Sequence, residues 1–386
     1  MKNISIYVHI PFCMSKCSYC SFVSKCANEK EIKKYFNMLN VQILAESGLF
    51  KNKIITSIYF GGGTPSFVDS KYIAEVLKTI NQYYNVSENA EITIECNPCS
   101  TTIEKLKNYK KFGINRISFG IQSLSDKCLK IIGRKHNKKM AIQAIKNAKN
   151  VGFLNISCDL LIGIPYQTTS ILLNNIANLA KLGINHISAY MLMLEEGTKL
   201  YEQVVINHSL TIADDDECVN MYNKAYSFLT KLGYKRYEIS NFALTGYECK
   251  HNINYWDMGE YVGFGLSAHS YYNGIRISRF YNFDDYYNYV REKYILRIKP
   301  NKLPEQELLT NQQKIEECLM LGLRQTKGVN IKILNNLGYN LIEVKKNTIK
   351  MLISKNIIDC NDNYLYITSN NFGATNQIIL DLLPEI

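Results

Sequence analysis

The sequence predicts an α/β fold in which a parallel sheet forms a complete or partial barrel, followed by a smaller helical domain. Three observations predict this fold. Short β-rich runs alternate with segments of helical period, a corner containing glycine recurs between them, and the pattern changes near residue 300. Barrels and doubly wound sheets share this alternation, and both gather their active groups at the C-terminal ends of the strands.

The β-rich runs are short and rich in β-branched and aromatic residues, as buried strands are. They cover residues 4–8, 57–60, 92–95, 116–120, 156–161, 186–191 and 237–240. Segments with helical spacing of apolar residues lie between them, over 29–47, 70–84, 102–112, 137–150, 170–182 and 215–232. The alternation therefore predicts six or seven βα units with right-handed crossovers.

One helix-to-strand corner recurs as FGINRIS, VGFLNIS, LGINHIS and, more loosely, LGYKRYEIS. Each corner holds a glycine that can take the left-handed conformation which ends a helix. These glycines are Gly113, Gly152, Gly183 and Gly233. The corners therefore predict where four helices end, shortly before the next β-rich runs begin.

The chain changes character after residue 300. Residues 299–310 predict a linker, and helical periods follow over 311–325, 330–337 and 342–355. A hairpin is predicted over 357–368, with its turn at Asn361, Asp362 and Asn363. Helices followed by a short hairpin resemble a winged helix. We expect a barrel core over 1–240, a barrel-associated segment over 241–300 and a winged-helix-like domain over 301–386.

Composition and charge narrow the class of protein. The chain of 386 residues is 46% hydrophobic, without an export segment or an apolar run near 18 residues, so we expect a cytoplasmic globular protein whose 12 cysteines are mostly thiols. The net charge is +11, yet residues 301–386 hold 9 basic and 9 acidic residues. The C-terminal domain therefore lacks the excess charge that DNA binding needs.

Cys13, Cys17 and Cys20 lie close together on a loop that follows the first predicted strand. Structural zinc normally takes four protein ligands, and no second C-x2-C pair stands at zinc-finger spacing. Three thiolates fit a [4Fe-4S] cluster in which one iron stays open to a substrate or cofactor chelate. The cysteine spacing therefore predicts an iron–sulfur site for chemistry.

With Tyr19 before its last cysteine, this C-x3-C-x2-C motif resembles that of the radical S-adenosylmethionine (SAM) superfamily. Within it, YVHIPFC and YFGGGTPS resemble the oxygen-independent coproporphyrinogen III oxidases and their relatives, the HemW haem chaperones, over at least residues 4–273. The resemblance implies a partial (β/α)6-type barrel with a [4Fe-4S] cluster on Cys13, Cys17 and Cys20. It also implies that SAM chelates the open iron and can be cleaved to a 5′-deoxyadenosyl radical.

The resemblance further implies which residues bind SAM. GGGTP, at 61–65, follows a predicted strand, and its glycines let backbone N–H groups approach a polar ligand, for which the family uses the SAM amino group. Glu95 resembles the family's ribose-binding glutamate, and three residues match contacts to a second SAM in the oxidases. The expected SAM-binding residues are Tyr7, Tyr19, Gly62, Gly63, Thr64, Glu95, Gln122, Arg134 and Asp159.

Two departures separate the chain from the oxidases. Phe22 stands where they carry a further cysteine, and the first predicted strand begins near residue 4, without their N-terminal extension. Both features match the haem chaperones, as does HNINYW at 251–256, which fits their haem-binding motif H-N-x-x-Y-W. We expect His251 to ligate haem iron, with Cys249 as alternate, while Tyr255 and Trp256 cover the macrocycle.

These features predict a haem chaperone that binds a cluster, SAM and haem and delivers haem to acceptor proteins, without coproporphyrinogen oxidase activity. Three alternatives stay open: decarboxylation of coproporphyrinogen III with the same cluster, tRNA modification on a basic barrel face, and DNA binding by the winged-helix-like domain. The expected partners are haem, haem-accepting proteins and an electron donor. No specific nucleic acid is expected, and contact with a membrane would be peripheral.

Overall fold

A computed structural model describes residues 2–384, and its centre is one large sheet that confirms the α/β class. The strand order is β12-β11-β10-β9-β1-β2-β3-β4-β5-β6-β8-β7. Six parallel strands follow one another in chain order at its centre, so the βα units form a partial barrel. They are β1 (Lys2–Ile10), β2 (Lys53–Gly62), β3 (Val86–Cys96), β4 (Arg116–Gln122), β5 (Asn155–Ile162) and β6 (His186–Met191).

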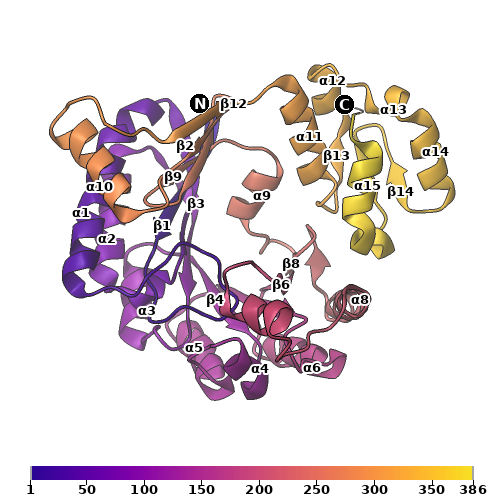
Figure 1. Ribbon diagram of the computed structural model, residues 1–386, viewed down its shortest axis with the longest axis horizontal. Coiled ribbons are helices and arrows are strands. Elements are labelled where there is room, and N and C mark those ends of the chain that lie inside the picture. The colour runs from indigo at the N-terminus through magenta and orange to yellow at the C-terminus, as the bar shows by residue number, and fades with distance from the viewer. Residues whose placement is uncertain (1, 385–386) are drawn as a thin grey trace.

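Helices cover the outer side of this curved sheet (Figure 1). The six predicted helices are confirmed to within one residue at each end, and the short α4 and α7 are additional. The helices are α1 (Glu29–Glu46), α2 (Ser70–Tyr83), α3 (Ile103–Lys111), α4 (Asp126–Ile131), α5 (Lys138–Asn150), α6 (Thr169–Lys181), α7 (Lys199–Tyr201) and α8 (Asp215–Lys231).

Local hydrogen bonds set where these helices begin and end. At the start of α1, Asn28 accepts from the N–H of Glu31, and the Glu31 carboxylate accepts from the N–H of Asn28, which is a capping box. The predicted corner glycines are confirmed, because all four have positive φ. Their values are +94° for Gly113, +95° for Gly152, +68° for Gly183 and +89° for Gly233.

The predicted strand over 237–240 is wrong. These residues join two short antiparallel strands, β7 (Lys235–Arg236) and β8 (Asn241–Ala243), and β8 pairs antiparallel with β6. The buried carboxylate of Glu238 causes the bend, since it accepts hydrogen bonds from Ser240 N–H (2.9 Å) and from the Asn241 side chain. The segment pairs instead with residues 324–326, through a bond from Ile239 N–H to Arg324 O (2.8 Å).

Four strands that the sequence did not predict extend the sheet beyond β1. β9 (Tyr261–Phe264) lies parallel to β1, and the next three strands continue the sheet in antiparallel pairing. These three are β10 (His269–Tyr272), β11 (Ile275–Ser278) and β12 (Glu305–Leu308), and the helices of this region are α9 (Lys250–Trp256) and α10 (Phe283–Val290). The segment 299–310, predicted as a linker, therefore contains the edge strand β12.

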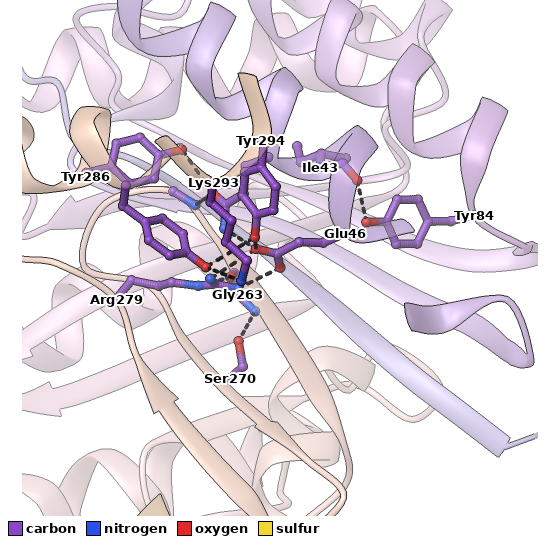
Figure 2. Close-up of polar contacts among 12 residues, drawn as sticks. Ile43, Glu46, Tyr84, Gly263, Ser270, Arg279, Tyr286, Lys293 and Tyr294 are labelled. Atoms are coloured by element: carbon purple, nitrogen blue, oxygen red, sulfur yellow. Dashed lines mark hydrogen bonds and ion pairs between the residues drawn. The ribbon is translucent and has the colours of Figure 1, made fainter. Parts of the chain in front are cut away.

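A buried ion pair attaches this extension to α1 (Figure 2). Arg279, which follows β11, donates to Glu46 of α1 at 2.8 Å, and Tyr294 donates to the same carboxylate at 2.6 Å. Burial acts to raise the pKa of Glu46, but the charge of Arg279 and these hydrogen bonds outweigh burial and lower it. Since an unpaired buried charge is strongly destabilising, the docking of the extension depends on both partners.

The C-terminal part has its own three-stranded sheet, in the order β13-β15-β14. The predicted hairpin is confirmed: β14 and β15 pair antiparallel, and Asn361 Oδ1 accepts from the N–H groups of Asn363 (3.0 Å) and Tyr364 (2.9 Å). The elements are α11 (Asn311–Gly322), β13 (Val329–Asn330), α12 (Ile331–Asn336), α13 (Leu341–Val344), α14 (Lys346–Ser354), β14 (Ile358–Cys360), β15 (Tyr364–Ile367) and α15 (Thr375–Leu382). Within residues 2–384, none of the helices combines the length and apolarity needed to cross a bilayer.

Candidate cofactor site

The three-cysteine motif lies on the loop between the C-terminal end of β1 and the start of α1, as predicted. Backbone hydrogen bonds fix both halves of this loop. Cys13 N–H donates to Lys25 O (3.0 Å), and Ser18 N–H donates to Ile132 O (3.1 Å). Cys13, Cys17 and Cys20 are each partly exposed. The loop is therefore held at the strand ends while its sulfurs stay accessible.

A cavity of about 450 Å³ opens beside this loop at the C-terminal ends of the parallel strands. We call it the strand-end cavity. It brings together all but one of the residues expected to bind the cluster or SAM. These are Cys13, Cys17, Tyr19, Cys20, Gly62, Gly63, Thr64, Glu95, Gln122, Arg134 and Asp159.

The surroundings of the cysteines fit thiolates that are stabilised by bound metal. Burial raises the pKa of the Cys13 and Cys20 thiols, so both need a nearby positive charge to ionise. Thr64 Oγ1 lies 3.3 Å from Cys13 Sγ, and Arg134 Nη1 lies 3.6 Å from Cys17 Sγ. In residues 2–384 no three such side chains converge as ligands of a single metal ion. The thiolates that hold an iron–sulfur cluster can lie farther apart than the ligands of a single ion, because each thiolate binds a different iron.

The GGGTP turn packs against the cysteine loop in a way that differs from the expectation. Gly63 N–H donates to Ile10 O and Thr64 N–H donates to Phe12 O, both at 2.9 Å, so these N–H groups hold the loop and do not face a ligand. Gly62 has φ +109°, and a Cβ there would lie 2.5 Å from the His9 ring. The turn therefore requires glycine for close approach of β1 and β2. The SAM amino group is a hydrogen-bond donor, so it would need acceptors at this turn, and backbone N–H groups are not acceptors.

Two carboxyl groups, on strands β3 and β5 that flank β4, line the cavity and are partly buried. Glu95, on β3, has its pKa raised to about 7, by burial first and by Asp159 second. Tyr59 donates a hydrogen bond to Glu95 Oε1 at 2.9 Å. Burial also raises the pKa of Asp159 on β5, whose Oδ1 accepts from Ser118 at 3.2 Å. Both carboxyl groups can accept hydrogen bonds from hydroxyl or amino groups of a ligand.

Polar atoms without a protein partner and one strained residue lie in the lining of the cavity. Arg134 donates to Gly120 O, yet its Nε has no hydrogen-bond partner in the structure, and neither has Nε of the buried Arg116. Gln122 at the end of β4 has φ +64°, which is strained for a residue other than glycine. Strain and unsatisfied donors of this kind cluster at binding sites. The residues present therefore fit a polar, charged cofactor.

Tyr7, expected to bind SAM, lies instead in a second cavity of about 640 Å³, which we call the aromatic cavity. Tyr255 of the expected haem motif lines the same cavity. Its aromatic and imidazole lining comes from Tyr7, His9, Phe22, Tyr255, Tyr261, His269 and Tyr271. Phe22, Gly62 and Glu95 line both cavities, so the two are neighbours.

The side chains expected to ligate haem iron are buried and do not reach either cavity. Cys249 is fully buried, and its thiol donates to Glu91 Oε1 at 3.4 Å. His251 is 1% exposed, with Nδ1 hydrogen-bonded to Ser57 Oγ (2.8 Å) and Nε2 to the Tyr255 hydroxyl (2.9 Å). Neither lines the strand-end or the aromatic cavity. Iron ligation by either residue stays a prediction, and it requires the start of α9 to move.

Trp256, expected to cover the macrocycle, lies apart from Tyr255. It lines a third cavity of about 390 Å³ at the C-terminal part, and its carbonyl accepts from Gln325 Nε2 at 2.9 Å. The structure therefore does not bring Tyr255 and Trp256 together on one cavity.

Sequence reasoning missed other residues that line the strand-end cavity, chiefly Arg116 and His186. Arg116 opens β4 and is almost fully buried, and His186 opens β6, where it bonds Ser157 Oγ and the Tyr237 hydroxyl, each at 2.7 Å. A charged or titratable residue at the start of a buried parallel strand is the signal that could have found both.

Comparison with known proteins agrees with this site. Residues 7–174 match the family model described as Radical SAM superfamily. A Bacillus subtilis protein named Heme chaperone HemW is 32% identical over 99% of this chain and 100% of its own. A Lactococcus lactis protein of the same name is 31% identical over 100% of this chain and 98% of its own.

Among solved structures, coproporphyrinogen III oxidase (HemN) from Escherichia coli, described as a radical SAM enzyme, matches with a TM-score of 0.85. The match covers 100% of this chain and 91% of that chain, at 19% sequence identity. At this identity the likeness establishes the shared fold, which confirms the predicted barrel.

Proposed function

We propose a haem-delivery function from one premise: the chain belongs to the HemW family of the radical SAM superfamily. Membership of the superfamily implies a [4Fe-4S] cluster and SAM. Cys13, Cys17 and Cys20 would hold the cluster, and Glu95 and Asp159 would accept hydrogen bonds from SAM. When bound, this pair supplies one-electron chemistry.

One observation supports the cofactor part of the proposal most strongly. Eleven of the twelve residues that the resemblance assigns to the cluster or SAM come from separate loops and strand ends, and they line one cavity. Haem and its acceptor proteins enter the proposal through the family, whose members named above are haem chaperones. The protein would bind haem reversibly and release it to a haem-free acceptor.

We further propose that the chain does not decarboxylate coproporphyrinogen III. Phe22 occupies the position of the further cysteine in the oxidases, and its ring is 65% exposed between the strand-end and aromatic cavities. An apolar ring can contact a macrocycle, but it offers no thiol for catalysis.

Transfer to a haem-free acceptor tests the proposal. The full chain is loaded with ferric haem, separated from unbound haem and mixed with an excess of an apo-haemoprotein whose holo-spectrum is distinct. We expect the acceptor's holo-spectrum to appear while the donor returns to the haem-free state. Haem that never binds, or that stays on this protein under a large excess of acceptor, would contradict the function.

A further inference from the structure

We propose that the aromatic cavity is the haem-binding pocket, and that His269 supplies the imidazole that ligates the haem iron. The inference rests on the proposed function, because it names the place and the ligand of the cargo. His269 begins β10, one of the four strands that the sequence did not predict.

The cavity has the size and lining that a planar apolar ring needs. Its volume of about 640 Å³ lies within the range of roughly 300–1,000 Å³ for cofactor sites. The rings of Tyr7, Tyr255, Tyr261 and Tyr271 provide faces against which a macrocycle can stack. The charged side chains of the aromatic cavity are Glu95, Arg276 and Glu317. The strand-end cavity adds the three cysteine thiols and carries Arg116, Arg134 and Asp159 beside Glu95, so it suits a macrocycle less well.

A cationic group lies where the acidic side chains of haem could be bound. Arg276, on β11, lines the aromatic cavity and pairs with Glu317 of α11 at 2.5 Å. A guanidinium has five N–H donors, so Arg276 can hold Glu317 and a propionate together. The salt bridge also joins the barrel extension to the C-terminal part at the edge of this cavity.

Two histidines line the aromatic cavity, and their hydrogen bonds distinguish them. His9 is buried, and both of its nitrogens lie 3.1 Å from internal partners, the Tyr7 hydroxyl and the Val23 carbonyl. His269 Nδ1 lies 2.9 Å from Ser278 Oγ, whereas Nε2 has only a 3.5 Å contact to the hydroxyl of exposed Tyr281. A contact of that length is at the limit of a hydrogen bond, so Nε2 is the more available imidazole nitrogen.

The bond to Ser278 also suits a metal ligand. Histidines that bind metal usually hold their second nitrogen by a hydrogen bond, which fixes the ring and its tautomer.

The geometry gives His251 a different role from iron ligation. Its Nε2 is bonded to the hydroxyl of Tyr255, which lines the aromatic cavity, and its ring stacks on Tyr59 at a centroid distance of 5.0 Å. His251 is therefore a positioning residue that holds Tyr255 at the wall. The HNINYW motif then contributes to haem binding through Tyr255, without a direct bond from its histidine to iron.

Titration of the full-length protein with ferric haem tests this assignment, followed by absorbance and electron paramagnetic resonance. We expect His269→Ala to weaken haem binding by about 10-fold or more and to lose the imidazole-ligated spectrum. Free imidazole should restore that spectrum by filling the vacated space. His269→Gln retains a polar side chain of similar size and should also lose the ligation. The matched control is His208→Ala in an exposed loop, which should behave like wild type.

His251→Ala separates the two assignments. We expect it to lower the melting temperature, since it removes buried hydrogen bonds, and to keep the imidazole-ligated spectrum. If folded His269→Ala and His269→Gln proteins bind haem with wild-type affinity and spectrum, the inference is overturned. Loss of the spectrum in His251→Ala alone would likewise overturn it and leave the haem-delivery function standing. Failure of the wild-type protein to bind haem would contradict that function as well.

Discussion

The strand-end cavity and the aromatic cavity share a wall but differ in what builds them. The strand-end cavity is formed by loops at the ends of parallel strands and is lined by thiols, partly buried carboxyl groups and guanidinium groups. The aromatic cavity is formed by the extension β9 to β11 together with β1, the cysteine loop and α11, and it is lined mainly by tyrosine and histidine rings. The difference suits the two kinds of ligand that we propose for this fold: a charged cofactor pair and a flat, largely apolar cargo.

Removing the three cysteines should abolish binding at the strand-end cavity and leave binding at the aromatic cavity intact. We expect the triple variant of Cys13, Cys17 and Cys20 to alanine to lose all cluster iron, because these are the only ligands at the required spacing on this loop. Haem binding should persist, since none of the three lines the aromatic cavity. Iron analysis and haem titration of the anaerobically reconstituted variant check this.

Two results would contradict that separation. Retained cluster iron in the triple variant would end the assignment of the cluster to these cysteines. Loss of haem binding together with the cluster would show that the cavities act as one site. The control is Cys26→Ala, an exposed cysteine of the same loop, which should keep wild-type iron content.

Breaking the buried ion pair should destabilise the extension that helps to form the aromatic cavity. We expect Arg279→Ala to reduce the free energy of unfolding by about 3–5 kcal/mol, because it leaves the Glu46 carboxylate buried and unpaired. Urea denaturation measures the change. Lys302→Ala removes a solvent-exposed pair with Asp285 and should leave the free energy of unfolding nearly unchanged. Equal losses in the two variants would mean that the buried pair does not anchor the extension.

Glu95 lies on the shared wall, so its replacement shows which ligand uses the carboxylate. We expect Glu95→Ala to weaken SAM binding by about 1–3 kcal/mol, the range for losing a charged hydrogen bond, with a smaller effect on haem. Calorimetry on the reconstituted protein measures both affinities. Glu88→Ala, at an exposed position of the same strand, is the matched control. Unchanged SAM affinity would place the ribose elsewhere.

The pKa of Glu95 predicts a smaller, pH-dependent effect. Burial and Asp159 raise this pKa to about 7, so the carboxyl is mainly protonated at pH 6 and mainly ionised at pH 8. Since the ionised form is the better acceptor, SAM affinity should rise with pH over this range, by up to roughly 10-fold. Glu95→Gln should lose this part of the pH dependence. An identical profile in the variant would assign the titration to another group.

The parallel half of the fold was predictable because each of its signals is local. Strands β1 to β6 are buried on both faces and read as apolar runs, and capped helices with glycine ends lie between them. The extension lacks such signals. β9 to β11 are only four residues long, and β9 pairs with β1, about 250 residues away. Pairing over that distance follows from the packing of the fold, which no local period records.

The residues of the two cavities also differ in how well the sequence predicts them. The residues expected to bind the cluster or SAM lie on predicted strands or in short motifs, so the resemblance could identify them from the sequence. Eleven of these residues line one cavity in the structure. The resemblance predicts that Tyr7 binds SAM, but alternation along β1 turns this side chain to the neighbouring cavity. The environment of His251 was not predictable, since it depends on Ser57 of β2 and Tyr59 beside it.

One preparation assayed for both activities can show whether this chain carries haem and takes no part in porphyrin decarboxylation. Protein reconstituted anaerobically with its cluster is titrated with haem and, in parallel, incubated with coproporphyrinogen III, SAM and a reductant. We predict binding of about one equivalent of haem and no decarboxylated product. Decarboxylation of coproporphyrinogen III by this preparation, or the absence of haem binding, would contradict the account.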